Sequence, residues 1–430
     1  MQSLNEEFIV VNSLIMGKRV VVTGMGVVSP VGNNVKTFWE NLKNGVNGIK
    51  KLTRFDTEGL AASVAGEITD FNPANFGIEP AFTRKQDLFS VYAVAAAKQA
   101  MDQSGLVSGD NIDPFRLGVY VGSGIGGFPS TYREVEKMIT SGPRWISPLY
   151  VPTMIPNIAS GNISIRHHAN GPCVPIVTAC ATATHSIGEA YRAIRHGYAD
   201  AIITGGTESP LIPMAVAAFA NAKALTSSDD PDYACLPFNV NRGGFVLAEG
   251  AGVIVLEEFE HAKARGAEIL GEICGYGNTC DGYHITAPRP DGVTQARAIE
   301  EALREAGYKA GKDTLYINAH GTGTQMNDKC ETNAFKLALG EEEAHRAHIS
   351  STKSMTGHPL GAAGGFEAIA AVMALREGIV PPTIHLDTPD PECDLDYTPN
   401  VAVEAPLTIA ISDSLGFGGH NACIAFRRIV

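Results

Sequence analysis

Short runs rich in Val, Ile and Gly alternate along the chain with longer alanine-rich stretches in which apolar residues recur at helical spacing. The first kind predicts buried strands, and the second predicts helices that end at glycine or a basic turn. Five runs are expected to be strands or strand-to-turn units: KRVVVTGMGVVSP (18–30), RLGVYVGSGIGG (116–127), VPIVTACA (174–181), YADAIITGGTES (198–209) and GAGVIVLEEFE (250–260). Four stretches are expected to be helices: 90–105, 186–197, 293–307 and 365–378. This alternation predicts an α/β protein whose mixed or parallel sheets are covered by helices.

The strand and helix units fall into two groups, roughly residues 18–265 and 266–430, each with glycine-rich turns. The sequence contains no short-period repeat and no low-complexity linker between the groups. We therefore expect two halves that share one tight interface. Residues 1–17 are expected to be an N-terminal extension, because a second plausible start, Met16, directly precedes GKRVVVTG.

The composition excludes several classes of protein. The 430 residues are 44% hydrophobic and 18% charged, which is typical of a globular chain and not of a disordered one. The 33 basic and 46 acidic residues give a net charge of −13, so nucleic acid is not an expected partner. No uncharged apolar span reaches membrane length, and the acidic N-terminus lacks the features of a signal peptide. We expect a cytoplasmic protein without a membrane segment.

The eight cysteines are scattered, and none forms a CxxC pair. This disfavours zinc ribbons and redox dithiols and fits a reducing compartment. Cys180 stands out because a β-branched run, PIVTA, meets a helical stretch there. The N–H groups and partial positive charge of a helix N-terminus can lower the pKa of a thiol below about 8.5. A thiolate is a good acyl acceptor, so Cys180 is a candidate nucleophile; a buried spectator, a metal ligand and a disulfide half are the alternatives.

Two histidines lie in loops of a similar kind. His320 follows the apolar run LYINA within NAHGTGTQMNDKCET, and SSTKSMTGHPLGAAGG carries Lys353 and His358 toward a helix. Loops at such edges are where α/β proteins place their chemistry, although these imidazoles could instead bond backbone in tight turns. No HExxH is present, and the pairs in RHHAN (166–170) and HRAH (345–348) have no companion ligand. We therefore expect no metal site.

Two glycine-rich turns complete the pattern. GSGIGG (122–127) matches GxGxxG, but the acidic strand end that a dinucleotide site requires about twenty residues later is missing. The turn is better explained by close approach to backbone or to an acyl chain. GFGG (416–419) lies between two apolar runs, where it could offer a backbone N–H to an oxyanion or form a simple hairpin.

Four motifs in this order, TACATATH, NAHGTGT, KSMTGH and GFGGHN, resemble the β-ketoacyl-acyl-carrier-protein synthases, above all the synthase II group of bacterial fatty-acid synthesis. The resemblance extends from about Lys18 to Val430. It implies a thiolase-like α/β fold of two similar αβαβα halves forming a five-layered core, and a homodimer. It also implies a decarboxylative Claisen condensation without a cofactor, in which an acyl group on Cys180 reacts with malonyl-acyl carrier protein to give 3-oxoacyl-acyl carrier protein.

The resemblance also implies a role for individual residues. Cys180 would accept the acyl group, His320 and His358 would be the catalytic histidines, and the backbone N–H groups of Cys180 and Phe417 would hold the oxyanion. Two neutral imidazoles suit the malonyl step because they can donate N–H to an enolate near pH 7 without carrying charge. The remaining residues are Lys353 with its partner Glu367, the supporting carboxylates Asp328 and Glu331, the gate Phe417, the pantetheine-channel residues Thr286, Thr322 and Thr324, and the acyl-pocket residues Ile125 and Phe219.

Some segments depart from the synthase II pattern. QMNDKCET replaces a small Pro-Ala-Gly-Asp-like run, and RKQDLF (84–89) replaces an Arg-Met-Asp-Arg-Phe-like run. QMNDKCET and PPTIHLDTPDPECDLDYTPN (381–400) also resemble the ketosynthase subunit of type II polyketide synthases, which would pair with a chain-length partner as a heterodimer. A non-catalytic chain-length subunit would lack Cys180, a thiolase would carry a second cysteine in the GFGG loop, and a plant-type polyketide synthase would favour Asn in place of His358.

Overall fold

A computed structural model describes residues 17–429. Apart from Gly17, the predicted N-terminal extension lies outside the described residues. Nine strands form one mixed sheet in the order β4-β5-β6-β1-β7-β13-β12-β8-β9. Their bounds are β1 Val20–Val28, β4 Leu117–Gly122, β5 Ala201–Glu208, β6 Gly250–Glu258, β7 Gly271–Cys280, β8 Leu315–Asn318, β9 His348–Ser350, β12 Ile409–Gly416 and β13 His420–Arg427. Two short pairs lie outside it: β2 Lys50–Lys51 with β3 Val64–Ala65, and β10 Ile379–Val380 with β11 Val403–Glu404.

The sheet consists of two half-sheets with the same strand order. In the first, β1 pairs antiparallel with β6, β6 antiparallel with β5, and β5 parallel with β4. In the second, β7, β13, β12 and β8 repeat this order and these directions. The halves meet where β1 pairs with β7 over only three residues, Val20–Val22. The two-half organisation that the sequence suggested is therefore a repeated topology.

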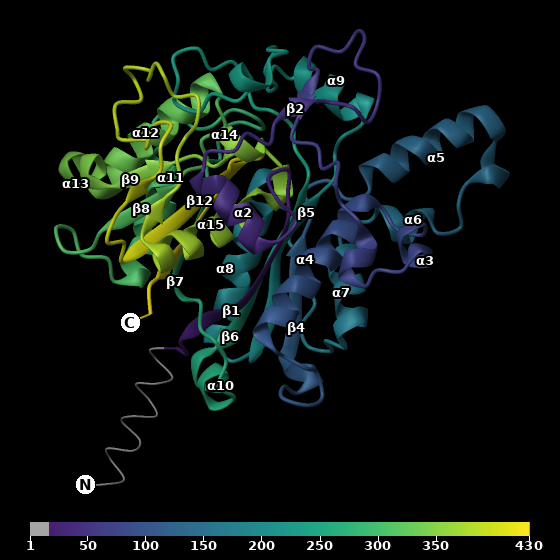
Figure 1. The fold of residues 1–430 in the computed structure, drawn as a ribbon, viewed down its shortest axis with the longest axis horizontal. Coiled ribbons are helices and arrows are strands. Elements are labelled where there is room, and N and C mark those ends of the chain that lie inside the picture. Colours follow the sequence, from purple (N-terminus) through teal and green to yellow (C-terminus); the bar gives the residue numbers. More distant parts are fainter. Residues whose placement is uncertain (1–16, 430) are drawn as a thin grey trace.

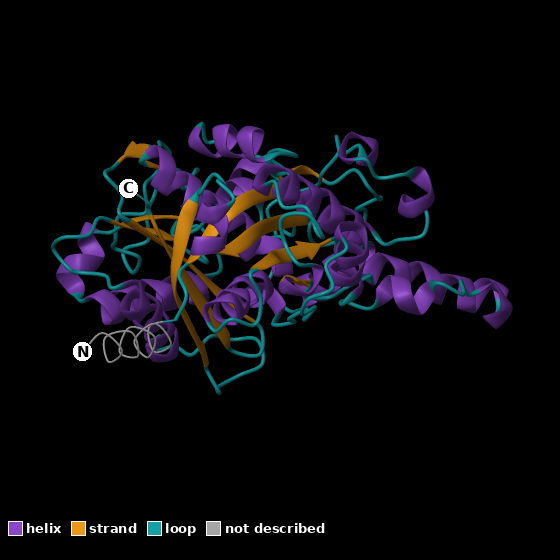
Figure 2. Ribbon diagram, turned by 90° about the horizontal axis from the view of Figure 1, so that it is seen from below, coloured by secondary structure: helices purple, strands orange, loops and turns teal. Residues whose placement is uncertain are grey.

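Helices cover both half-sheets and also separate them (Figures 1 and 2). α4 packs on β1 and β6, α11 packs on β7 and β13, and α8 and α15 contact each other and strands of both halves. This is the five-layered α/β arrangement that was expected. The helices are α2 Val35–Lys43, α3 Pro80–Thr83, α4 Leu88–Ser104, α5 Phe128–Ser141, α6 Tyr150–Met154, α7 Ile158–His167, α8 Thr182–Arg195, α9 Pro213–Asn221, α10 Phe259–Ala264, α11 Val293–Ala306, α12 Gln325–Leu339, α13 Glu341–Arg346, α14 Lys353–Thr356 and α15 Ala363–Glu377.

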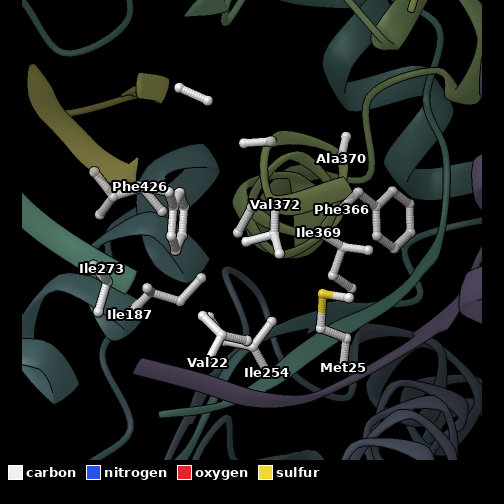
Figure 3. Packing of buried hydrophobic residues seen from close by; sticks show 14 of the residues in the cluster. Val22, Met25, Ile187, Ile254, Ile273, Phe366, Ile369, Ala370, Val372 and Phe426 are labelled. Carbon is white, nitrogen blue, oxygen red and sulfur yellow. The ribbon is translucent and has the colours of Figure 1, made fainter. Parts of the chain in front are cut away.

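The central layer explains the apolar character of α15. Nearly every residue of this helix is buried, as expected for a helix that is hydrophobic on all sides. Figure 3 shows Phe366, Ile369 and Val372 of α15 facing apolar residues of both half-sheets: Val22, Met25, Ile254, Ile273 and Phe426. The core therefore runs through both halves, and the loops at the ends of α8 and α15 are fixed by it.

One strand prediction is wrong. The run 174–181 forms no strand; only a single bridge joins neighbouring Cys173 to Val119 of β4. The run lies along the outer edge of β4, and Pro175 has no N–H to donate to a ladder. The other four predicted strands and the four predicted helices are confirmed. Within residues 17–429, no helix is both long enough and apolar enough to span a membrane.

Candidate active site

A cavity of about 550 Å³ brings together loops from both halves of the chain. Its walls include Cys180, His320, His358 and Phe417, which are separated by up to 237 positions along the sequence. Thr286, Thr322 and Thr324 also line it. Seven of the residues expected at a site therefore line one cavity, although the sequence places them in five separate segments.

Cys180 lies in a single turn, Ala179–Ala181, directly before α8. Ala179 has a φ of +51°, a left-handed conformation that a residue with a Cβ adopts at a cost. The turn is bonded from Ala181 N–H to the Thr178 carbonyl (3.1 Å), and α8 is joined to β12 by Thr184 and Ser414 (2.7 Å between hydroxyl oxygens). The nucleophile candidate is therefore fixed to both half-sheets.

The expectation that the helix N-terminus lowers the pKa of Cys180 is wrong. Burial raises the pKa of this thiol from 9.0 to about 12, and Lys353 and the backbone N–H groups of Phe417 and Cys180 lower it only in part. The reason is that a thiolate in this buried pocket loses its hydration, and the helix end does not make up for that loss. Cys180 is therefore protonated at rest, and its proton must leave as an acyl bond forms.

The two loop histidines lie side by side. The ring centroids of His320 and His358 are 5.4 Å apart with the planes nearly perpendicular. Two backbone hydrogen bonds hold His358. Its backbone N–H donates to the Val246 carbonyl (2.7 Å), and its carbonyl accepts from the Ala248 N–H (3.1 Å). Burial, reinforced by Lys353, holds the pKa of both imidazoles well below 6.5. Both rings are neutral at pH 7 and can donate an N–H without carrying charge.

The GFGG turn is a hairpin turn that also reaches the thiol. It closes the antiparallel β12–β13 hairpin, and it brings the backbone N–H of Phe417 to the sulfur of Cys180. The ring of half-buried Phe417 lies 6.5 Å from that of Phe219. The N–H groups of Phe417 and Cys180 both approach the sulfur, where they could bind the oxyanion of an acyl carbonyl that the sulfur attacks.

Lys353 and three carboxylates lie behind the histidines, outside the cavity wall. Lys353 forms an ion pair with Glu367, and both are almost completely buried. Glu331 accepts a bond from the backbone N–H of Gly321 (2.8 Å), beside His320. Burial and neighbouring Asp413 raise the pKa of Glu331, while burial raises the pKa of Asp413 to about 7. Two buried carboxylates this close cannot both ionise readily at neutral pH.

Asp328 and Arg242 fix the wall that carries Thr322 and Thr324. Asp328 accepts bonds from the N–H groups of Phe238 (2.8 Å) and Gly323 (3.2 Å). Arg242 donates to the carbonyls of Thr324 (3.3 Å) and Gln325 (3.0 Å), and its Nε lies 3.8 Å from Asp328. The hydroxyls of Thr322 and Thr324 are 3.1 Å apart. This wall of the cavity is therefore held from inside the protein by a buried ion pair.

Ile125 and Phe219 do not line the described cavity. They pack instead on an apolar cluster that contains Cys180, Phe245 and Leu360. Phe245 joins this cluster to the histidines, because its ring lies 5.7 Å from Phe219 and 5.0 Å from His358. The expected acyl-pocket residues are thus beside the nucleophile, on a different side from the threonines.

Sequence reasoning missed Phe245, Arg242, Asp413 and Glu208. Glu208 ends β5 and accepts four hydrogen bonds from turns around Cys180. A weak signal was available for it, since a carboxylate directly after the apolar run AIITGGT is unusual at a buried strand end. Arg242 and Phe245 lie in NRGGF, a run with no apolar period to mark it.

Comparisons with known proteins identify the family of the chain. Residues 17–262 match the N-terminal domain of β-ketoacyl synthases, and residues 270–387 match the C-terminal domain. The 3-oxoacyl-[acyl-carrier-protein] synthase 2 of Staphylococcus aureus strain N315 is 50% identical over 411 residues, 96% of this chain and 98% of that protein. The protein of the same name from Synechocystis is 47% identical over 412 residues, with the same coverage.

Solved structures show the same fold. A type II polyketide synthase ketosynthase, in complex with its acyl-carrier protein and bound to the hexaketide, superposes with a TM-score of 0.89 at 35% identity. The match covers 96% of this chain and 100% of that one. Two matching domains and near-complete coverage at 50% identity leave one conclusion: the chain belongs to the β-ketoacyl synthase family.

Proposed function

We propose that this protein is a 3-oxoacyl-[acyl-carrier-protein] synthase that extends acyl chains in fatty-acid synthesis. The observation that carries the proposal is the cavity in which one thiol, two neutral imidazoles and two convergent backbone N–H groups meet. Each of these groups serves one step of a decarboxylative condensation. The curated relatives bear the same activity in their names.

The first step is acyl transfer. The Cys180 sulfur attacks the thioester carbonyl of an acyl-carrier protein, and the N–H groups of Cys180 and Phe417 bind the oxyanion. The carrier thiol leaves and takes up the proton that Cys180 loses. Because burial keeps Cys180 protonated at rest, loss of the proton and attack are coupled.

The second step is condensation. Malonyl-carrier protein loses carbon dioxide and becomes an enolate, whose oxygen accepts N–H bonds from His320 and His358. The enolate carbon attacks the acyl-Cys180 carbonyl, and the sulfur leaves and regains a proton. The products are carbon dioxide and 3-oxoacyl-carrier protein. Lys353 with Glu367, and Asp328 with Glu331, support the histidines and their loops from behind. The threonine wall receives the pantetheine arm, Thr286 at its exposed mouth.

The test is intact-protein mass spectrometry after incubation with acyl-carrier thioesters, followed by malonyl-carrier protein. We expect an acyl adduct on Cys180 that disappears as 3-oxoacyl-carrier protein forms, and no adduct in Cys180→Ala. Chain elongation by Cys180→Ala would refute the assignment.

We further propose a homodimer. The helix α5 extends away from the body of the chain (Figure 1) and exposes apolar side chains, among them Met138 and Ile139 (79% exposed), with Trp145 (69%) in the following loop. Exposed apolar area of this extent is typical of an interface. Light scattering should give twice the chain mass, and Ile139→Glu should reduce it. Val401→Glu, also at a highly exposed position (71%), is the matched control.

A type II polyketide ketosynthase is the second candidate, favoured by the structural neighbour and by the QMNDKCET segment. The two candidates differ in what happens with excess malonyl-carrier protein and no reductase. A fatty-acid synthase stops at one 3-oxoacyl product, whereas a polyketide synthase with its chain-length partner adds several units. We place the reaction in the cytoplasm and the boundary between the halves near residue 265.

A further inference from the structure

Glu208 is a fully buried carboxylate beside the nucleophile to which the proposed mechanism gives no role. Its Oε1 accepts bonds from the Ser123 hydroxyl (2.7 Å) and the Ile125 N–H (3.2 Å). Its Oε2 accepts bonds from the N–H groups of Gly124 (2.8 Å) and Gly361 (3.0 Å). Only a carboxylate can accept at both oxygens from four donors, since an amide would present an NH₂ group to two of them. The side chain is therefore matched to its surroundings as a carboxylate.

The four donors belong to two turns from different halves of the chain. Ser123–Ile125 follows β4, and Leu360–Gly361 lies between His358 and α15. The turns pack so closely on Glu208 that a Cβ at Gly124 would lie 2.8 Å from Oε2, and one at Gly361 would lie 2.7 Å from it. The same Cβ at Gly124 would lie 3.2 Å from the Ala179 carbonyl. Glu208 thus joins both turns to each other, next to the turn of Cys180.

Two of these turns contain strained residues. Ala179, before Cys180, has a φ of +51°, and Leu360 has a φ of +44°. A branched residue such as Leu is seldom found in this region, and the surroundings must hold it there. Gly361, whose N–H is bound by Glu208, directly follows Leu360. The bond from Gly361 to Glu208 therefore helps to hold Leu360 in its left-handed conformation.

The side chains that these turns carry form the apolar surface next to the sulfur. Leu360 is in the cluster that contains Cys180, and Ile125 packs on it. An acyl chain attached to Cys180 must lie against this surface, because the opposite side of the cavity is lined by the threonines and histidines. A shift of either turn changes the room for the chain, while His358 keeps its own bonds to Val246 and Ala248.

We propose that Glu208 is a positioning residue that sets which acyl chains Cys180 accepts, because it fixes Ile125 and Leu360 against the turn of the nucleophile. The inference rests on the proposed acyl-transfer function and adds a specificity determinant to it. Glu208 contacts no substrate atom; it acts through the two turns.

The test uses Glu208→Gln in the full-length protein. The rate of Cys180 acylation is measured by intact-protein mass spectrometry with a series of pantetheine thioesters from butyryl to palmitoyl. We expect the ratio between the fastest and slowest chain to change by about tenfold or more, as pocket-shape changes of this kind do. Malonyl decarboxylation, which depends on the histidines, should change by less than about threefold.

Glu257→Gln is the matched control. Glu257 is equally buried and lies on the neighbouring strand β6, but it bonds Thr23, His261 and Arg265, away from the site. An unchanged acyl-length profile in Glu208→Gln, or a uniform loss that tracks melting temperature as in Glu257→Gln, overturns the proposal. If Glu208→Gln does not fold, Ser123→Ala removes one donor and must shift the profile in its place. Failure of the proposed function is seen separately, as absence of any Cys180 adduct in the wild type.

Discussion

The turns next to Cys180 and the turn that follows His320 are held by buried carboxylates, Glu208 in the first case and Asp328 in the second. Glu208 takes all of its recorded bonds from a hydroxyl and backbone N–H groups. Asp328 also takes bonds from backbone N–H groups but lies 3.8 Å from Arg242. Burial raises the pKa of Glu208 to about 7 and that of Asp328 to about 6. The ordinary pKa values of the two groups, 4.5 and 3.8, already differ in the same direction, and Arg242 opposes the rise at Asp328.

The difference teaches how the two sides of the site are built. The thiol side needs a shaped apolar surface, and Glu208 fixes that shape through hydrogen bonds from a hydroxyl and backbone N–H groups. The histidine side tolerates cations: Lys353 helps to keep the imidazoles neutral, and Arg242 lies beside Asp328 behind the threonine wall. Substitutions on the two sides should therefore impair different reactions.

The largest expected effect separates the two sides by chemistry. Cys180→Ala should lose acyl transfer by a factor on the order of 10⁴ or more but retain malonyl decarboxylation, whereas His358→Ala should retain acylation and lose decarboxylation. Mass spectrometry of the adduct and carbon dioxide release from malonyl-carrier protein measure the two reactions. Loss of both reactions in both variants would mean that the sides are not separable.

Arg242→Lys tests the cation on the histidine side. Lysine keeps the charge but cannot bond Thr324, Gln325 and Asp390 at once. We expect a loss of about 3 kcal/mol in the free energy of unfolding, since a buried ionic network is broken. KM for carrier-bound substrates should rise by about tenfold, with a smaller change for a short thioester that lacks the pantetheine arm. Equal changes for both substrates would argue against a role in the channel wall.

Glu208→Gln tests the carboxylate whose hydrogen bonds come from a hydroxyl and backbone N–H groups. The four donors favour the carboxylate, but burial outweighs them and raises the pKa of Glu208 from 4.5 to about 7, so the folded protein binds its proton more tightly than the unfolded chain. The stabilising contribution of this proton is present below about pH 4.5 and is lost as the pH rises to about 7, an effect on the order of 3 kcal/mol. Urea unfolding across this range should show a flatter pH dependence in the variant; an identical slope would contradict the raised pKa.

The smallest effect on stability is expected at Phe417, which lies between the thiol side and the histidine side of the site. Phe417 is half-buried, so Phe417→Ala should cost about 1 kcal/mol or less in unfolding. Its ring faces Phe219 across the mouth of the acyl side, so the order in which acyl and malonyl substrates react should be disturbed more strongly. Burst kinetics with each substrate added first would detect this. Parallel losses of stability and activity would count against a gate.

The order of the elements and the motif residues were predictable from sequence because both depend on local pattern. Val20–Val28 and Ala201–Glu208 are short runs rich in β-branched residues, whereas 365–378 is a longer alanine-rich run, so length and residue type distinguish strand from helix. The edge run before Cys180 was mispredicted, because its apolar residues match a strand whether or not a neighbouring strand pairs with it. A hydrophobic pattern can specify which face of a segment is buried, but whether the segment pairs as a strand depends on its neighbours in the fold.

The sequence by itself predicted an α/β chain in two halves, and its resemblance to the β-ketoacyl synthases implied a thiol and two imidazoles as the reacting groups, with a glycine turn beside them. Only the tertiary structure decided how those groups behave. Burial, which depends on residues far away in the chain, raises the pKa of Cys180 where the helix end alone would lower it. The same burial makes the histidines neutral. The fold also places Glu208, an ordinary acidic residue in the sequence, where it bonds two turns that are distant in the chain. Desolvation is a property of the folded interior, and no local run of residues encodes it.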